Sequence, residues 1–146
     1  MKRLLFLMAT VFCTTLIIRA FTVGNGNSDI ERIQSFYHKY AVAYNLKDYR
    51  QANAQCDSIL SVYCTSKMCK DTKEDRVNRI SYDFATDNIG IDEDALKTLR
   101  IVQDGDYYVV TYRLNDINDR FQKIVRNVKL QVTMDNGKIA TVKSVK

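Results

Sequence analysis

The feature that most constrains the fold of this chain is the pair Asn136-Gly137, which lies between two segments of alternating apolar residues. Asn-Gly readily supplies the two positive φ angles that a type I′ turn requires. The flanking segments, 123–134 and 139–145, are rich in the residues that favour strands. The sequence therefore predicts a β-hairpin at the end of the chain.

A second hairpin is predicted just before it. Asp104-Gly105-Asp106 separates the strand-like segments 99–103 and 107–114, and a polar loop, 115–121, follows. Apolar residues alternate along the two long segments, which predicts one buried face and one solvated face. The predicted buried set is Tyr108, Val110, Tyr112, Leu114, Val128, Leu130, Val132 and Met134. We expect a four-stranded antiparallel sheet.

Upstream, apolar residues recur at helical spacing. Ser28 and Glu31 form a capping-box pattern that predicts the start of a helix over 29–45. A second helix is predicted over 48–63, and a charged stretch, 66–81, predicts a short exposed helix and a loop. The fold class is thus α+β, with N-terminal helices packed on a curved sheet in one domain, 29–146.

The N-terminus is typical of a secretory signal. Two basic residues precede the apolar run Leu4–Ile18, which is short for a permanent membrane span. We expect a signal peptide over 1–20, with cleavage as late as residue 26 as an alternative, and a flexible linker over 21–28. The remaining alternative is an uncleaved N-terminal membrane anchor. Localisation is predicted to be periplasmic or secreted.

The charge balance changes once this leader is removed. The whole chain has 22 basic and 17 acidic residues, and Lys2, Arg3 and Arg19 belong to the leader. The mature domain then has 22 − 3 = 19 basic residues, a net charge of about +2. With no Lys/Arg cluster in the linear sequence, we expect no nucleic-acid partner.

Three cysteines remain in the mature chain: Cys56, Cys64 and Cys69. Export favours one disulfide, and we predict Cys64–Cys69, with Cys56–Cys69 as the alternative. No histidine accompanies the cysteines at the spacing of a zinc site, so we predict no metal. The acidic run Asp92–Asp94 lacks the turn glycine of a calcium loop and is typical of the entry to a strand or helix.

The order of elements resembles the NTF2-like, cystatin-like superfamily, and more narrowly the DUF3828 family of exported bacterial proteins of unknown function. The segments that carry this resemblance are 33–40, 83–87, 105–110 and 136–139. It implies a helical lid on a curved sheet, often enclosing a pocket. Enzymes of the NTF2-like group place an Asp or His with a Tyr inside such a pocket, where burial shifts pKa values.

Few residues are candidates for a site. Arg126 is in phase with the buried face of its strand, so it either reaches solvent or meets an anionic ligand. The candidate ligand-binding set is Arg126, Tyr40, Tyr44, Tyr108 and Tyr112, and ordinary core packing is the alternative for the tyrosines. His38 lies at the edge of its helical stripe, which favours an exposed residue over a base. We predict no catalytic residue.

The sequence therefore predicts an exported, non-catalytic domain without a cofactor. Its partner is a protein, peptide or small ligand, bound through the concave sheet face or through loops. One alternative is an NTF2-like enzyme that uses His38, or a loop aspartate, together with a tyrosine. Another is a periplasmic immunity-type inhibitor that blocks a toxin by surface contact.

Overall fold

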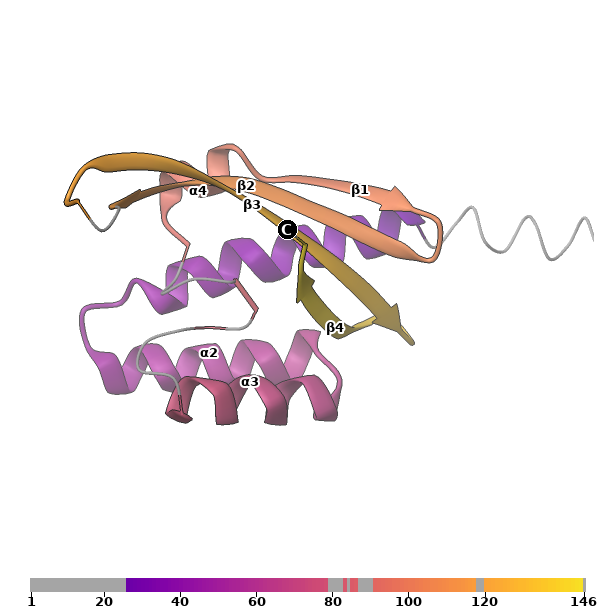
Figure 1. Ribbon diagram of the computed structural model, residues 1–146. Helices are drawn as coiled ribbons and strands as arrows, with labels where there is room; N and C mark the ends of the chain where they lie inside the picture. Colours follow the sequence, from indigo (N-terminus) through magenta and orange to yellow (C-terminus); the bar gives the residue numbers. More distant parts are fainter. Residues whose placement is uncertain (1–25, 79–82, 84, 87–90, 118–119, 146) are drawn as a thin grey trace, which may run out of the picture.

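The computed structural model describes residues 26–78, 83, 85–86, 91–117 and 120–145, and the predicted signal peptide lies outside these residues. Figure 1 shows the long helices on one side of a single sheet, with the first helix, residues 26–44, directly against it. The α+β class and the order of helices before strands are confirmed. No helix of the described part is long and apolar enough to cross a membrane.

The first helix presents an aromatic stripe to the sheet. Ile33, Phe36, Tyr37 and Tyr40 are fully buried, as their spacing predicts. The predicted capping box at Ser28 is wrong, because residue 26 is already helical and Ser28 lies inside the helix. The last three residues of the expected 21–28 linker are therefore part of this helix.

Helix α2, Tyr49–Tyr63, follows the prediction closely. The side chain of Asp48 caps its N-terminus and accepts a hydrogen bond from the backbone nitrogen of Gln51, at 2.9 Å. The buried stripe of this helix is Ala52, Cys56, Leu60 and Tyr63. The stripe faces the core.

Helix α3, Ser66–Asn78, is more regular than the short helix and loop that the sequence predicts. The ion pairs Lys67–Asp71 and Lys70–Glu74, both at i,i+4, lie on its exposed side. Met68 and Thr72 anchor it to the core, and both are buried. One side of α3 therefore packs on the core, and its charged side faces solvent.

A short helix, α4 (Glu93–Lys97), precedes the sheet. The side chain of Asp92 caps it and accepts from the backbone nitrogen of Ala95, at 2.6 Å. The acidic run therefore marks a helix entry, as predicted.

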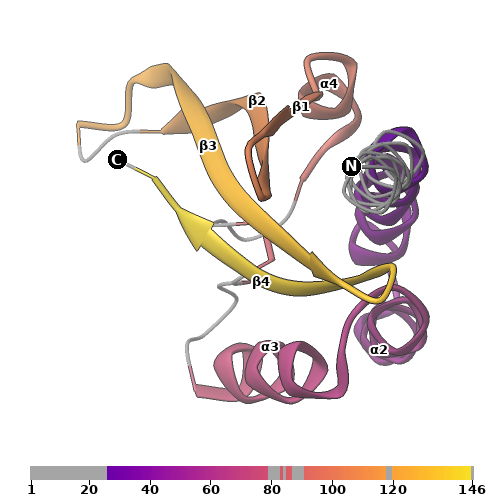
Figure 2. The same ribbon diagram turned by 90° about the vertical axis from the view of Figure 1, so that its right-hand side faces the viewer.

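The sheet consists of β1 (Arg100–Asp104), β2 (Tyr107–Ile117), β3 (Lys123–Asp135) and β4 (Lys138–Ser144), in sequence order and antiparallel throughout. Asn136 and Gly137 both have positive φ, 48° and 70°, which confirms the predicted turn. Strand β2 continues to Ile117, so residues 115–117 belong to the sheet and not to the predicted polar loop. Figure 2 shows the sheet curving from β1 to β4, with α2 and α3 beneath β4.

The two faces of the sheet differ sharply in burial. The face toward the helices, which we call the inner face, carries Tyr108, Val110, Tyr112 and Leu114 of β2, all nearly inaccessible to solvent. Val128, Leu130 and Val132 of β3 continue it, and Met134 is partly buried. Each such side chain contributes roughly 1.5–3 kcal/mol by leaving water. The alternation of apolar and polar residues along β2 and β3 therefore determines which face of the sheet is buried.

Candidate functional site

The four predicted tyrosines lie largely in the interior of the described part of the chain. Tyr40, Tyr108 and Tyr112 are buried and Tyr44 is half-buried. The Tyr108 hydroxyl donates to Asp29 Oδ2 at 3.0 Å, and the Tyr112 hydroxyl donates to the carbonyl oxygen of Thr86. These hydroxyls are thus bound by the chain itself, which is the core-packing alternative.

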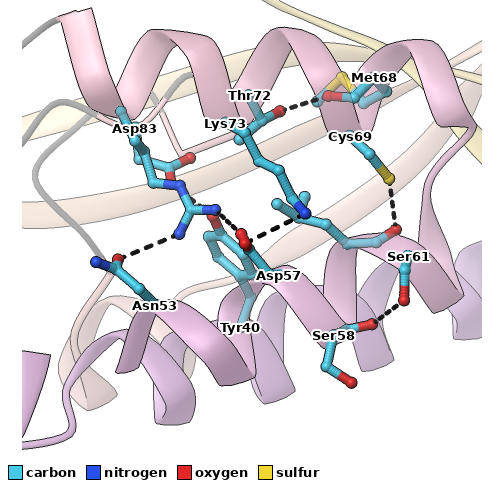
Figure 3. A network of polar contacts seen from close by, with 12 residues as sticks. Tyr40, Asn53, Asp57, Ser58, Ser61, Met68, Cys69, Thr72, Lys73 and Asp83 are labelled. Atoms are coloured by element: carbon cyan, nitrogen blue, oxygen red, sulfur yellow. Dashed lines mark hydrogen bonds and ion pairs between the residues drawn. The ribbon is translucent and has the colours of Figure 1, made fainter. Parts of the chain in front are cut away.

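Tyr40 belongs to a buried polar network that joins the helices to the segment before the sheet. Its hydroxyl donates to Asp83 Oδ2 at 2.5 Å, and the backbone nitrogen of Ala85 donates to Asp83 Oδ1 at 2.8 Å. Figure 3 shows Asp83 and Tyr40 close together beneath α3. Both residues are fully buried. The sequence resemblance implied that an aspartate and a tyrosine could meet in the interior, and this pair does.

Arg76 of α3 extends the network outward. Its Nε lies 3.9 Å from Asp83 Oδ2, and its Nη2 pairs with Asp57 of α2. Asp57 also pairs with Lys73, at 3.2 Å, and Asn53 accepts from Arg76 at 3.4 Å. Figure 3 shows Asp57 of α2 directed toward Lys73, with Asn53 one turn earlier on the same helix. The network therefore ties α2, α3 and the first helix to Asp83.

The electrostatics of this network follow from burial. Burial raises the pKa of Asp83, and the hydrogen bonds from Tyr40 and Ala85 and the charge of Arg76 only partly offset it. Burial also raises the pKa of Tyr40 far above its ordinary value, and the nearby Asp83 adds to this. For Arg76, burial alone would lower the pKa, but Tyr40, Asp83 and Asp57 outweigh it and raise the pKa.

Tyr40 and Asp83 are enclosed by the surrounding residues. A general base must come within hydrogen-bond reach of the substrate, and neither Tyr40 nor Asp83 has exposed surface. Two depressions in the surface of the described residues are bordered by other side chains. We conclude that the pair holds the helices and the pre-sheet segment together.

His38 lies on the exposed side of the first helix. Its side chain is therefore turned away from the buried stripe of that helix. The prediction that His38 is exposed is confirmed. Among the described residues, no group of three or more His, Cys, Asp or Glu side chains is arranged to hold a metal ion.

The predicted Cys64–Cys69 disulfide is absent, and Cys56, Cys64 and Cys69 are free thiols. Cys69 Sγ is directed at the carbonyl oxygen of Leu60, at 3.1 Å, where it contacts the end of α2. Burial raises the pKa of Cys56 to about 11 and that of Cys64 to about 12, so both are poor thiolates. They pack as small apolar residues.

Arg126 lies near the start of β3, close to the connection from β2, and its side chain is about one-third exposed. Its Nε is 3.3 Å from Asp116 Oδ2 on β2. This ion pair lies close to the end of the β2–β3 hairpin. A role for Arg126 toward a ligand stays a prediction.

The face of the sheet that is turned away from the helices, which we call the outer face, was predicted to be solvated, but the sequence reasoning placed no candidate site on it. A depression of about 820 Å³ is found there, lined by the strand residues Arg100, Thr111, Arg113, Asn127 and Lys129 together with Lys97 and Thr98 at the end of α4. The signal for it was available, because Asn127 and Lys129 alternate with the buried residues of their strand. Its basic character arises because the fold brings together basic residues of α4, β1, β2 and β3.

The end of the β2–β3 hairpin is the second missed feature. Large apolar side chains there are exposed instead of buried, and we call them the hairpin tip: Ile117, Phe121, Ile124 and Val125. Phe121 is 91% exposed and has a positive φ of 58°, a strained conformation for an aromatic residue. In Figure 1 this end of the sheet, in orange, extends beyond the body of the protein at the left. Ile117 and Val125 lie on the outer face of the sheet.

No known family profile matches the chain, and no curated protein is similar to it in sequence. The resemblance to the DUF3828 family therefore stays a prediction. The chain is similar in structure to a protein of unknown function from Bacteroides thetaiotaomicron, with a TM-score of 0.66 and 17% identity. That match covers 88% of this chain and 98% of the other.

Two further solved structures share the fold. The solution structure of TraH from the Gram-positive conjugative plasmid pIP501 has a TM-score of 0.53 and 15% identity, and covers 83% of this chain and 94% of the other. A de novo designed β-sheet protein has a TM-score of 0.51 and 12% identity, over 82% and 88% of the two chains. At these identities the similarity shows the fold alone.

Proposed function

We propose that this chain is an exported, non-catalytic binding domain that contacts a protein partner through the hairpin tip and the adjoining outer face of the sheet. The observation that carries the proposal is the hairpin tip. Soluble proteins seldom leave large apolar side chains together in water unless a partner covers them. Aromatic side chains such as Phe121 are also enriched where protein partners meet.

The packing of the interior supports surface contact over the alternatives. A small-ligand site or an active site requires a concave space with convergent polar groups. On the inner face that space is filled by Phe36, Tyr37 and Tyr40, and the ring of Phe36 contacts each of the two tyrosine rings at a centroid distance of 5.1 Å. The polar groups there are directed at one another. The concave face is therefore less suited to a ligand than the loops.

Site-directed photo-crosslinking in the native host tests the proposal. A photo-reactive phenylalanine analogue replaces Phe121, and in a matched control it replaces Tyr49, which is 76% exposed on the first turn of α2. We expect one discrete crosslinked protein from position 121 and none from position 49. Equal products from both positions, or none from position 121, would contradict the proposal. A toxin as the captured protein would identify the immunity-type alternative.

Export has a separate test. The mass of the protein recovered from the envelope or medium of the native host gives the position of its N-terminus. We expect a start between residues 21 and 27, because the apolar run is a cleaved signal. A mass that retains Met1 would instead support the N-terminal membrane anchor.

A further inference from the structure

The depression on the outer face is lined by basic side chains from separate parts of the chain. We call Lys97, Arg100, Arg113 and Lys129 the basic depression; all four side chains are exposed. They come from the end of α4 and from strands β1, β2 and β3. Thr98, Thr111 and Asn127 add hydroxyl and amide groups to its lining. The lining thus offers hydrogen-bond donors on three adjacent strands.

The strand register explains why these charges meet. Arg100 lies opposite Thr111, and Thr111 lies opposite Lys129, so the three residues form one row across the sheet. Arg113 and Asn127 form the next row on the same face. Neighbouring strands are about 4.8 Å apart, so Arg100 and Lys129 are separated by roughly 10 Å at the backbone. The cations are close enough to act on one ligand.

Most of these charges lack a counter-charge among the described residues, in contrast to the cations of α3. Lys67, Lys70, Lys73 and Arg76 of α3 all pair with carboxylates. In the basic depression Lys97 pairs with Asp94 at 2.7 Å. No ion pair joins Arg100, Arg113 or Lys129 to a carboxylate of the described residues. The outer face therefore has a local excess of positive charge in a domain that is nearly neutral.

We propose that the basic depression binds the acidic side chains of an extended Asp/Glu-rich segment of the protein partner. This inference rests on the proposed function and names the chemistry of the partner's contacting segment. Arginine is suited to it because its guanidinium binds a carboxylate through two parallel hydrogen bonds. Alternate residues of an extended chain are about 6.8 Å apart, which matches the step from one row of the depression to the next.

The surroundings of the depression favour a polypeptide. Two residues of the hairpin tip, Ile117 and Val125, lie on the same outer face, next along the strands from Arg113 and Asn127. A polypeptide segment combines carboxylates with an apolar anchor that this arrangement can receive. Single-stranded nucleic acid is usually held by stacking on exposed aromatic rings, and the only ring in the lining, that of Tyr112, is buried. The cations also lie around a hollow, whereas a bilayer presents its headgroups in a plane.

Fluorescence anisotropy with a labelled peptide of alternating Glu and Ser tests the inference on the exported protein. We expect saturable binding that weakens as salt rises, and no binding of the Gln-Ser peptide of equal length. The double variant Arg113→Glu, Lys129→Glu should bind the acidic peptide at least about tenfold more weakly. The matched control is Lys47→Glu, Arg50→Glu, which makes the same change in net charge at exposed positions that do not line the depression.

Several outcomes would overturn the inference. Equal losses in both double variants would show that only net charge is sensed, and absence of peptide binding would remove the ligand class. A thymidine oligonucleotide or phosphatidylglycerol vesicles that bind through Arg113 and Lys129, while the peptide does not, would assign a different ligand. The variant Arg113→Gln, Lys129→Gln is the folding control. If its thermal midpoint equals that of the wild type and it still binds the peptide more weakly, the loss of binding does not come from misfolding.

The crosslink from position 121 separates the two proposals. If that product persists in the variant Arg113→Glu, Lys129→Glu, and the peptide does not bind, the proposed function stands and the acidic segment is excluded. If position 121 captures no protein at all, the proposed function fails whatever the peptide does.

Discussion

Alternate residues of β2 and β3 lie in two different environments. On the inner face the side chains are excluded from water, and the buried hydroxyls of Tyr108 and Tyr112 are bound within the chain. On the outer face, cations such as Arg113 lack an ion pair with the described carboxylates, and Val125 is exposed. A face that satisfies its own groups stabilises the fold, whereas a face with unmatched groups is suited to a partner. This difference is the basis of our proposal that a partner binds the outer face.

The largest expected effect on the free energy of unfolding distinguishes two consecutive residues of β3. Leu130 is fully buried on the inner face, and Lys129 is exposed on the outer face. Leu130→Ala should lower the free energy of unfolding by about 2–5 kcal/mol, because it leaves a cavity. Lys129→Ala should change it by less than about 0.5 kcal/mol. Urea unfolding measures both, and similar values for the two variants would remove the distinction between the faces.

The next effect concerns the buried pair beneath the helices. Asp83→Ala leaves the Tyr40 hydroxyl and the Ala85 backbone nitrogen without their acceptor. We expect a loss of about 3 kcal/mol in the free energy of unfolding, since each unsatisfied buried group costs about 1–3 kcal/mol. Tyr40→Phe keeps the ring and should cost about 1 kcal/mol. A loss below that of Tyr40→Phe would show that Asp83 does not hold the network.

The pH dependence of stability gives a smaller effect from the same carboxyl group. Burial raises the pKa of Asp83 in the folded protein. Asp83 then binds its proton more tightly when folded, so its contribution to stability is complete below the ordinary Asp pKa and is lost as pH rises through the raised value. As pH rises above about 4, stability should fall more steeply in the wild type than in Asp83→Asn. Parallel profiles from urea unfolding would contradict this sign.

The smallest expected effect on stability is at the hairpin tip. Phe121 and Val125 are 91% and 61% exposed, so little apolar surface is buried there on folding. The double variant Phe121→Ser, Val125→Ser should keep its free energy of unfolding within about 0.5 kcal/mol of the wild type. A loss similar to that of Leu130→Ala would mean that the tip is part of the core and not a contact surface.

Local patterns predicted much of the fold. The turn at Asn136-Gly137 was predictable because few other residue pairs adopt two positive φ angles readily. The alternation along β2 and β3 predicted which side chains are buried, and the stripe of α2 predicted its inner side. Each of these signals lies within a few residues of the structure that it specifies.

Contacts between distant residues were not predictable. Ser28 was read as a helix cap because the capping box is a local pattern, whereas the helix already includes residue 26 and places Asp29 against Tyr108. The pairing of Tyr40 with Asp83 spans 43 positions. The basic depression depends on the register that places Arg100, Thr111 and Lys129 in one row. The turn at Gly105 sets the pairing of Arg100 with Thr111, but no local spacing reveals the pairing of Thr111 with Lys129.

The yield of the crosslinked product from the photo-reactive residue at position 121 tests the central claim most directly, when it is measured in one variant of each face. The inner-face variant is Tyr40→Phe, and the outer-face variant is Ile117→Ser, Val125→Ser. At a temperature where both are folded, we expect an unchanged yield from the inner-face variant and a large loss from the outer-face variant. Loss of the product in folded Tyr40→Phe, or its persistence in the outer-face variant, would contradict the assignment of partner binding to the outer face.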